Sequence, residues 1–294
     1  ASAFFPSPFE NAAILTLDGV GEWSTTSIAI GRSNVLSIDR EIHFPHSLGL
    51  LYSAFTYYTG FRVNSGEYKV MGLAPYGNPK YVNTIRDNLI DLKSDGSFEL
   101  NMQFFDYCTG KTMINRDFKE LFGGEPRKPE SEIHQRDMDL AASIQVVTDE
   151  VVLKLAASAK RITGDKNLCL AGGVALNCVT NGKLLKSDMF EKIWIQPAAG
   201  DAGGALGAAL AFYYSMTGAP RFGESGKDGM SGCFLGPEYT NSEIENQLLE
   251  CGAKFLKLSD SDLLGLVAKE LANGFAVGWH SGKMEFGPRS LGGR

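Results

Sequence analysis

The sequence predicts an α/β domain, and two successive strand–turn–helix units are the main reason. Residues 167–171 (NLCLA) form a short apolar run that ends at a glycine pair and is followed by a helical stretch. Residues 192–196 (KIWIQ) form a second such run, followed by a turn that carries an aspartate and by a helix of small residues. Strands that alternate with helices are typical of α/β sheets, which bind ligands beyond the carboxyl ends of their strands.

Three apolar runs near the start of the chain predict an antiparallel β element. They cover residues 12–17, 27–31 and 35–38, and polar or glycine-rich turns separate them. The first turn, at 18–26, begins with Asp-Gly-Val-Gly and ends with two threonines. We therefore expect a glycine-rich hairpin at one end of this element.

Helical periodicity follows in four places. Apolar and aromatic residues share one face over 48–59, and the longest helical pattern covers 137–162 and ends at Gly164. In this long helix we expect the charged residues to lie off the apolar face. Residues 174–185 and 202–216 are the helices of the two strand–turn–helix units. A Gly- and Pro-rich stretch before the long helix predicts a surface insertion around 123–129.

A change in composition divides the chain. Residues 224–232 (ESGKDGMSG) have the composition of a linker. We assign residues 1–231 to a first domain, and residues 232–294 to the linker and the beginning of a second domain. In that second region, Thr240 and Glu243 have the spacing of a capping box, which predicts a helix.

The end of the second region predicts one more helix and a strand. Ser259 precedes an apolar-periodic stretch that stops at Gly274, and residues 275–279 have the composition of a strand. The chain begins at Ala1 without an initiator Met and stops in a glycine-rich polar run at 287–294. We therefore expect a fragment that is truncated at both ends.

Composition limits the classes of function. The chain has 294 residues, of which 44% are hydrophobic, and its formal net charge is −6. An acidic chain without a Lys/Arg block lacks the charge pattern of a nucleic-acid binder. The longest weakly polar stretch, at 203–214, is shorter than the ~20 residues of a membrane span. The five cysteines are odd in number and widely spaced, which favours reduced thiols and a cytoplasmic location.

The glycine pair Gly172-Gly173 is the first candidate binding feature. Glycines after a buried strand let the backbone turn sharply, and the N–H groups of the next helix then point toward an anion such as phosphate. Asn177 follows one turn later and suits a nucleotide contact. A tight strand–helix turn with a buried asparagine explains the same residues, and both interpretations stay open on this feature.

Two aspartates are also candidates. Asp201 follows the second strand, where its carboxylate can bind a metal or cap the next helix. Asp18, Gly19 and Gly21 are similar to the phosphate hairpins of actin-like ATPases, but a DGxG run is also an ordinary β-turn. Neither alternative is excluded by these residues.

The remaining candidates are weaker. Glu67 and Lys69 alternate around a tyrosine, so a strand would present both to one site, or to solvent. His43 and His46 flank Pro45, which argues against a shared helical face and a metal site. The three tryptophans are interpreted as packing residues rather than a stacking platform; they are Trp23, Trp194 and Trp279.

Seven runs taken together resemble the O-carbamoyltransferases of nodulation-factor and antibiotic biosynthesis. They lie in order along the whole chain, and their combination is specific. The runs are ASAFFPSPF at 1–9, LDGVGEWSTT at 17–26, PHSLGLLYSAFTYYTGF at 45–61, SGEYKVMGLAPYG at 65–77, LAGGVALNCVTNGKL at 170–184, QPAAGDAGGALGAAL at 196–210 and MEFGPRSLGGR at 284–294. Two regions, 65–77 and 170–201, also resemble more distantly the tRNA threonylcarbamoyl transferases, which share the actin/Hsp70-type fold.

The resemblance implies an actin/Hsp70-like fold that lacks its N-terminal strands here, followed by the start of a synthase-like α+β C-terminal domain. It implies a two-step reaction, in which ATP and carbamoyl phosphate give a carbamoyl-adenylate in the C-terminal domain and the actin-like domain carries out the transfer. The carbamoyl group then moves to a hydroxyl of a sugar-containing acceptor, such as a nodulation factor or an antibiotic. The family holds a divalent metal, expected to be Fe²⁺, between Asp201 and two histidines of an HxxxH run that precedes Ala1. Mg²⁺ can accompany the ATP.

The resemblance also implies roles for individual residues. Arg289 and Arg294 are expected to bind carbamoyl phosphate, because the guanidinium fork pairs with phosphate oxygens. Their run reads GPRSLGGR, and Ser290 and Gly293 depart from the family's GPRALGNR. No catalytic residue is assigned. The residues expected to bind the nucleotide or carbamoyl-adenylate are Asp18, Gly19, Gly21, Thr25, Glu67, Lys69, Gly172, Gly173 and Asn177.

Two alternative functions are kept. One is a tRNA threonylcarbamoyl-type transferase, which requires a basic docking face that the acidic composition disfavours. The other is a non-enzymatic, actin-like nucleotide-binding module. Without the two histidines we expect this fragment alone to be inactive. The acceptor, the identity of the metal and a homo-oligomeric state are left open.

Overall fold

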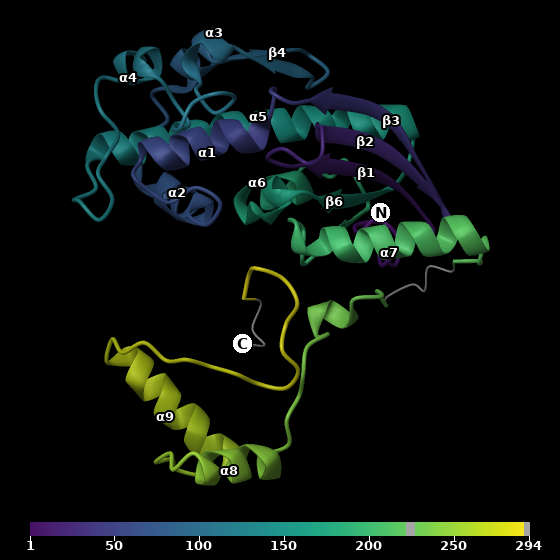
Figure 1. Cartoon of the computed structure of the whole chain (residues 1–294), viewed down its shortest axis with the longest axis vertical. Helices are drawn as coiled ribbons and strands as arrows, with labels where there is room; N and C mark the ends of the chain where they lie inside the picture. The colour runs from purple at the N-terminus through teal and green to yellow at the C-terminus, as the bar shows by residue number, and fades with distance from the viewer. Residues whose placement is uncertain (222–226, 291–294) are drawn as a thin grey trace. The chain divides into compact units, whose positions relative to one another are not determined.

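The computed structural model describes residues 1–221 and 227–290. The chain divides into two compact units, Ala1–Gly229 and Met230–Arg294. The first unit contains all of the strands that the structure assigns within the described ranges (Figure 1). We describe each unit by itself.

A five-stranded mixed sheet is the centre of the first unit. Its order is β3-β2-β1-β6-β7; the first three strands are antiparallel to one another, and β1, β6 and β7 are parallel. A separate two-stranded hairpin lies outside this sheet. The strands are β1 (Asn11–Leu17), β2 (Ser24–Arg32), β3 (Val35–His43), β4 (Ile90–Leu92), β5 (Phe98–Leu100), β6 (Asn167–Ala171) and β7 (Lys192–Ile195).

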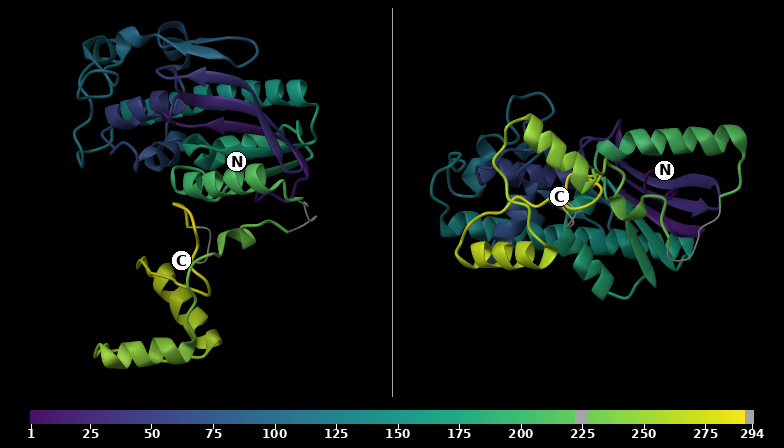
Figure 2. Two further views of the ribbon diagram at one scale, coloured as in Figure 1. Left: turned by 45° about the vertical axis from the view of Figure 1, so that its right-hand side comes forward. Right: turned by 90° about the horizontal axis from the view of Figure 1, so that it is seen from below.

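Helices surround the sheet. Those of the first unit are α1 (Leu48–Tyr58), α2 (Glu67–Leu73), η1 (Ala74–Tyr76), α3 (Val82–Asn88), η2 (Met102–Phe104), α4 (Arg116–Leu121), α5 (Gln135–Thr163), η3 (Gly173–Leu176), α6 (Cys178–Lys186) and α7 (Ala202–Thr217). The views of Figures 1 and 2 agree that α5 and α7 cover opposite faces of the sheet. The α/β fold class is therefore confirmed.

The side chains of β1 alternate between two apolar cores, which explains why both faces of the sheet are covered by helices. Leu15 and Leu17 contribute to the core on the side of α1 and α5, whereas Ala12 and Ile14 contribute to a second core with the start of the chain and α7. Successive side chains of a strand point to opposite faces, so a strand that is apolar at every position must be buried on both. The same alternation holds along β6.

Several predicted elements are confirmed. The strand at 167–171 has its predicted bounds, and the long helix ends at Gly164 in the left-handed conformation, with φ 69°. The predicted insertion at 123–129 lies at the surface without regular structure, and Gly123 and Gly124 both have positive φ. These features depend on local chemistry, which the sequence displays directly.

Other predicted elements need correction. The strand predicted at 35–38 continues to His43, because its charged second half pairs with β2 as an exposed edge strand. The helix predicted at 174–185 is divided, since η3 ends at Asn177 and α6 begins after it. The charges of α5 do not avoid its buried surface: Asp137, Asp139 and Asp149 are buried. Packing on several sides leaves the middle of this helix without a free face.

The second unit contains η4 (Ser231–Cys233), α8 (Asn241–Glu250) and α9 (Asp260–Ala272). The predicted capping box is present: Thr240 accepts from the N–H of Glu243, whose side chain accepts in return from the N–H of Thr240. The strand predicted at 275–279 is wrong. These residues are described, and they have no regular secondary structure. Along the described ranges, no helix combines the length and the apolar character needed to cross a membrane.

Candidate functional site

Three loops leave the sheet where the carboxyl ends of its parallel strands meet. They follow β1 at Asp18, β6 at Gly172 and β7 at Gln196. The N–H of Gly172 donates to the carbonyl of Ala199 at 2.8 Å, which joins the second loop to the third. The edge of a parallel sheet is where α/β proteins bind ligands. This edge is therefore the candidate site.

The carboxylate of Asp18 joins the first loop to the second. Its Oδ1 accepts from the N–H of Gly19 at 2.8 Å and from the N–H of Gly173 at 3.2 Å. The carbonyl of Asp18 accepts from the hydroxyl of Ser47 at 3.0 Å, and that serine also caps the N-terminus of α1. One aspartate thus connects the two glycine loops and the start of a helix.

Gly172 needs to be glycine for two reasons. Its φ is 92°, which side-chain-bearing residues rarely adopt, and a Cβ would lie 2.1 Å from the carbonyl oxygen of Leu17. Gly21, in the first loop, is similarly restricted, since its φ is 58° and a Cβ would lie 2.6 Å from the carbonyl oxygen of Ser24. The close approach of the β1 and β6 ends explains the first restriction, independently of any ligand.

Asn177 is buried, and the structure gives its side chain partners within the protein. Its Oδ1 accepts from the N–H of Thr180 at 3.1 Å, so it caps α6. Its Nδ2 donates to Oε1 of Gln145 at 3.0 Å, and its Oδ1 lies 3.2 Å from Nε2 of the same glutamine. Its contact with a nucleotide stays a prediction.

Gln145 connects α5 to α1 and α6 through a network that the sequence did not reveal. The hydroxyl of Tyr52 donates to Oε1 of Gln145 at 3.1 Å, and Nε2 of Gln145 lies 3.0 Å from Thr180 Oγ1. Asp149 accepts from Thr180 and pairs with Lys183, at 2.6 and 2.5 Å. The only sequence signal was two polar residues four positions apart, Gln145 and Asp149, among the apolar residues of the long helix.

Burial is the largest cause of the change in the pKa of Tyr52 in this network. It raises the pKa of Tyr52, and the nearby carboxylates of Asp149 and Glu67 raise it further. A buried polar cluster is stable only when its members are paired, because an unpaired buried polar group costs about 1–3 kcal/mol. We conclude that the network fixes α6, and with it the turn that begins at Gly172, against α5.

Asp201 lies at the start of α7 and is exposed. Its side chain makes no capping hydrogen bond, so the N-cap alternative is not realised. Within residues 1–221 and 227–290, no three His, Cys, Asp or Glu side chains form a group that could hold a metal. One carboxylate does not make a metal site. The implied metal therefore stays a prediction, and we derive no step through it.

Thr25 has a structural role in the first loop. Its side chain is buried, and its hydroxyl donates to the carbonyl of Ile42 at 3.2 Å and to the carbonyl of His46 at 2.5 Å. The N–H of Asp18 donates to the carbonyl of Thr25 at 2.8 Å and closes the base of the loop. This threonine therefore holds the hairpin against the end of β3.

Glu67 and Lys69 lie on helix α2, so the strand interpretation is wrong. Residues two positions apart on a helix do not share a face. Oε1 of Glu67 accepts from the hydroxyl of Ser53 and from the N–H of Asn64, each at 2.9 Å. Lys69 is exposed, with Nζ 5.8 Å from the centre of the Phe61 ring.

The predicted carbamoyl phosphate residues belong to the second unit. Arg289 is half-buried in a segment without regular structure. Arg294 lies outside the described residues.

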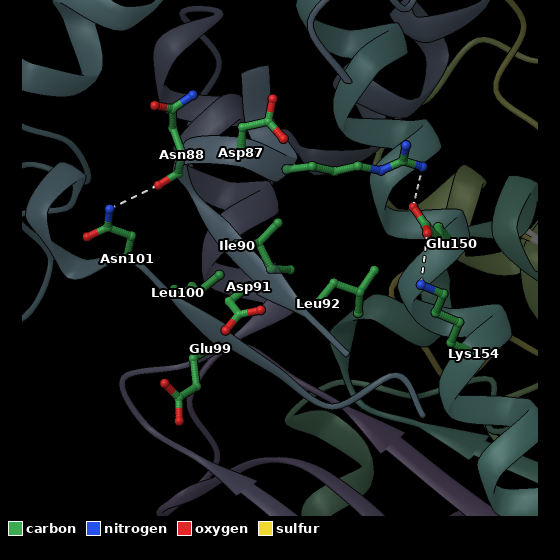
Figure 3. A pocket seen from close by; sticks show the side chains of 11 residues that line it. Asp87, Asn88, Ile90, Asp91, Leu92, Glu99, Leu100, Asn101, Glu150 and Lys154 are labelled. Atoms are coloured by element: carbon green, nitrogen blue, oxygen red, sulfur yellow. Dashed lines mark hydrogen bonds and ion pairs between the residues drawn. The ribbon is translucent and has the colours of Figure 1, made fainter. Parts of the chain in front are cut away.

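A surface cavity of about 560 Å³ lies at the β4–β5 hairpin (Figure 3). Glu150 pairs there with both Arg86 and Lys154. None of the predicted site residues lines it, and its lining cations are already paired. We therefore assign it no ligand. The lining residues are Arg86, Asp87, Asn88, Ile90, Asp91, Leu92, Glu99, Leu100, Asn101, Glu150 and Lys154.

Comparison with known proteins identifies the family of this chain. Residues 1–210 match the family described as "Carbamoyltransferase N-terminus". The chain belongs to the carbamoyltransferase family. The matched residues include all three loops of the candidate site.

Three relatives of this carbamoyltransferase chain cover its whole length. An uncharacterized protein of Synechocystis sp., sll1178, is 61% identical, and the match covers 48% of that protein. The nodulation proteins NolNO of Sinorhizobium fredii and NolO of Bradyrhizobium diazoefficiens are each 35% identical, over 41% and 50% of their lengths. The chain thus spans about half the length, or less, of these curated relatives.

Proposed function

We propose that the protein to which this chain contributes transfers a carbamoyl group to a hydroxyl, through a carbamoyl-adenylate made from ATP and carbamoyl phosphate. The family supports the carbamoyl chemistry. The observation that carries the AMP-linked donor is the meeting of the glycine loops after β1 and β6, held together by Asp18. Such loops suit a phosphate-bearing ligand, because glycine leaves the surface of the loop without side chains. The N–H groups of Gly19, Gly172 and Gly173 are themselves paired within the protein.

Each part of this edge has a task in the proposal. Gly172 and Gly173 let the ligand approach the backbone, and Asp18 fixes the spacing of the two loops beside it. The Gln145 network prevents α6 from shifting when the ligand binds. Preorganisation of this kind reduces the entropy lost on binding and holds the reacting atoms in one geometry.

The transfer step needs mainly positioning, because a mixed anhydride is already activated. The oxygen of the acceptor hydroxyl attacks the carbamoyl carbon, the bond between that carbon and the phosphate oxygen breaks, and AMP leaves. The hydroxyl proton leaves to a base, which we do not assign. The products of transfer are the carbamoylated acceptor and AMP. The earlier formation of the adenylate consumes one water and releases phosphate from carbamoyl phosphate and pyrophosphate from ATP.

The finer predictions are proposed on the resemblance. They are an actin/Hsp70-like fold, a synthase-like second domain, nucleotide contacts by Glu67 and Lys69, and carbamoyl phosphate contacts by the arginines at 289 and 294. The mixed sheet with its ligand loops at one edge supports the first of these. A divalent metal, expected to be Fe²⁺, is kept as a proposal in which Asp201 supplies one ligand and the two histidines of the family's HxxxH run supply the others.

The test uses the full-length protein with ATP and carbamoyl phosphate. We expect ATP consumption that depends on carbamoyl phosphate, and transfer of the carbamoyl group to a hydroxyl acceptor, followed by mass spectrometry. Asp18→Asn weakens the hydrogen bonds to Gly19 and Gly173 because an amide oxygen is a poorer acceptor than a carboxylate. We expect kcat/KM for carbamoylation of the acceptor to fall about tenfold or more, as for the loss of ~1.4 kcal/mol.

Asp188→Asn is the matched control, because Asp188 is exposed and away from the three loops. It should leave kcat/KM unchanged. Wild-type kinetics for Asp18→Asn would remove the sheet edge from the proposal. A wild-type protein that consumes no ATP with carbamoyl phosphate would disprove the adenylate route.

A further inference from the structure

Trp23 is exposed, contrary to the expectation that it packs in the core. Its exposed fraction is 59%. Trp is on average one of the more buried residue types, and the neighbours of this indole decide what its exposure means. It belongs to the loop between β1 and β2, the loop that begins at Asp18.

The backbone around Trp23 is fixed although the indole is open. The carbonyl of Trp23 accepts from the N–H of Phe44 at 2.9 Å, and the hydrogen bond between Asp18 and Thr25 closes the loop at its base. Trp23 is two residues from Thr25, which is at most about 7 Å of extended chain. The indole therefore lies close to the loop that we propose for the donor.

An aromatic cluster supports one side of the indole. The ring centre of Trp23 lies 6.3 Å from those of His43 and Phe44, and Phe44 lies 6.3 Å from the ring centre of Tyr107. The hydroxyl of Tyr107 donates to the carbonyl of Pro45 at 2.8 Å. A supported aromatic ring loses little conformational entropy when it binds a ligand.

Polar groups border the same surface. Glu41 accepts from the hydroxyl of Ser24, and its Oε2 lies 3.5 Å from Nε2 of His43. The side chains of His43 and Glu41 are 49% and 34% exposed, so each can still reach a ligand. Hydrogen bonds from Ser24 and His43 hold the pKa of Glu41 below its usual value, which keeps it an acceptor.

We infer that Trp23, bordered by Glu41 and His43, is the subsite that binds a sugar ring of the acceptor. A pyranose has an apolar C–H face that can stack on an indole, and hydroxyls at its rim that can bond to the carboxylate and the imidazole. Glu22 and Glu41 place negative charge here, which disfavours a phosphodiester backbone. This inference rests on the proposed function and specifies its acceptor class.

The experiment uses the full-length protein and chitotetraose, a soluble N-acetylglucosamine oligomer, as the probe. Saturation-transfer NMR measures binding for wild type, Trp23→Ala, Trp23→Phe and Phe212→Ala. Phe212 is a matched control, since it is an exposed aromatic residue on α7. We expect Trp23→Ala to weaken binding about tenfold or more, and Trp23→Phe to weaken it less because an aromatic face remains.

Carbamoyl phosphate-dependent ATP consumption is measured in parallel, without acceptor. Its absence from wild type would overturn the proposed function, whereas its presence in wild type, with no loss of binding in Trp23→Ala, would overturn this inference alone. The absence of transfer from wild type to chitotetraose would overturn the sugar assignment. Equal binding by Trp23→Ala and wild type, or equal losses for Trp23→Ala and Phe212→Ala, would overturn the role of Trp23.

Discussion

Asp139 shows how a charged side chain is kept inside the first unit. It is 1% exposed, and its Oδ2 pairs with Lys80 Nζ at 2.6 Å. Its Oδ1 accepts from the N–H of Asn78 and from Nε2 of Gln135, both at 2.8 Å. Burial alone would raise the pKa of Asp139, but these hydrogen bonds outweigh burial and hold the pKa below its usual value. The carboxylate therefore stabilises the folded state while it is ionised.

Asp139→Asn should lower the free energy of unfolding at pH 7 by about 2 kcal/mol, since it removes an ion-paired hydrogen bond. A folded-state pKa below the unfolded value means that the stabilisation is present above the unfolded pKa, near 3.9, and is lost as the pH falls through the folded pKa. The difference between wild type and variant should therefore narrow below about pH 4. Urea denaturation at several pH values measures it.

Asp91→Asn is the control for this prediction. Asp91 also pairs with a lysine, Lys93, but both side chains are exposed. Exposed pairs contribute about 0–1 kcal/mol, so this variant should behave almost as wild type. An equal loss of stability in the two variants would contradict the claim that the buried pairing of Asp139 contributes more than an exposed pair.

The turn between β6 and α6 consists of a glycine turn, a short 3-10 helix and a helix cap. Gly172 turns the chain against the end of β1, η3 follows, and Asn177 then begins α6. The sequence indicated the turn and its glycines. It did not indicate the division of the helix. The side chain of Asn177, which caps α6, is also bonded to Gln145, a residue distant in sequence.

Gly172→Ala should destabilise the protein by about 2 kcal/mol or more, because it combines an unfavourable φ with a clash against the carbonyl of Leu17. Gly182→Ala should have the opposite effect. Gly182 lies inside α6 and a Cβ there meets nothing within 4 Å, so alanine should stabilise the helix by about 0.5–1 kcal/mol. Chemical denaturation of both variants measures the difference, and equal signs would contradict this account.

Arg221 connects the two ends of the first unit. Its guanidinium donates to the carbonyls of Phe5 at 2.7 Å, Phe4 and Ser7 at 2.8 Å, and Phe9 at 2.9 Å. The guanidinium carbon also lies 4.4 Å from the centre of the Phe4 ring. Residues more than 200 positions apart in sequence are thereby fixed beside α7, and the second core forms around them.

Arg221→Lys should lower the free energy of unfolding by about 2–3 kcal/mol, because an ammonium group has three donors and lacks the planar fork. Limited proteolysis should then cut within residues 1–9 earlier than in wild type. Arg40→Lys is the control, since Arg40 is an exposed residue of β3. An unchanged cleavage pattern in Arg221→Lys would mean that the first nine residues are held by the core alone.

The sequence by itself determined the features that depend on neighbours along the chain. The strands β6 and β7, the end of α5 at Gly164 and the capping box at Thr240 follow from periodicity, glycine and side-chain capping. The order of the motifs also indicated the carbamoyltransferase family. These features depend on residue types that are close together along the chain, so the sequence displays them directly.

Only the tertiary structure decided which side chains meet. The pairing of Gln145 with Asn177, the bridge from Asp18 to Gly173 and the exposure of Trp23 each depend on how distant segments pack. The same residue types can be core, cap or ligand site in different surroundings. Burial and hydrogen-bond partners are properties of the packed chain, and they set the energy of each polar group far more than its neighbours in sequence do.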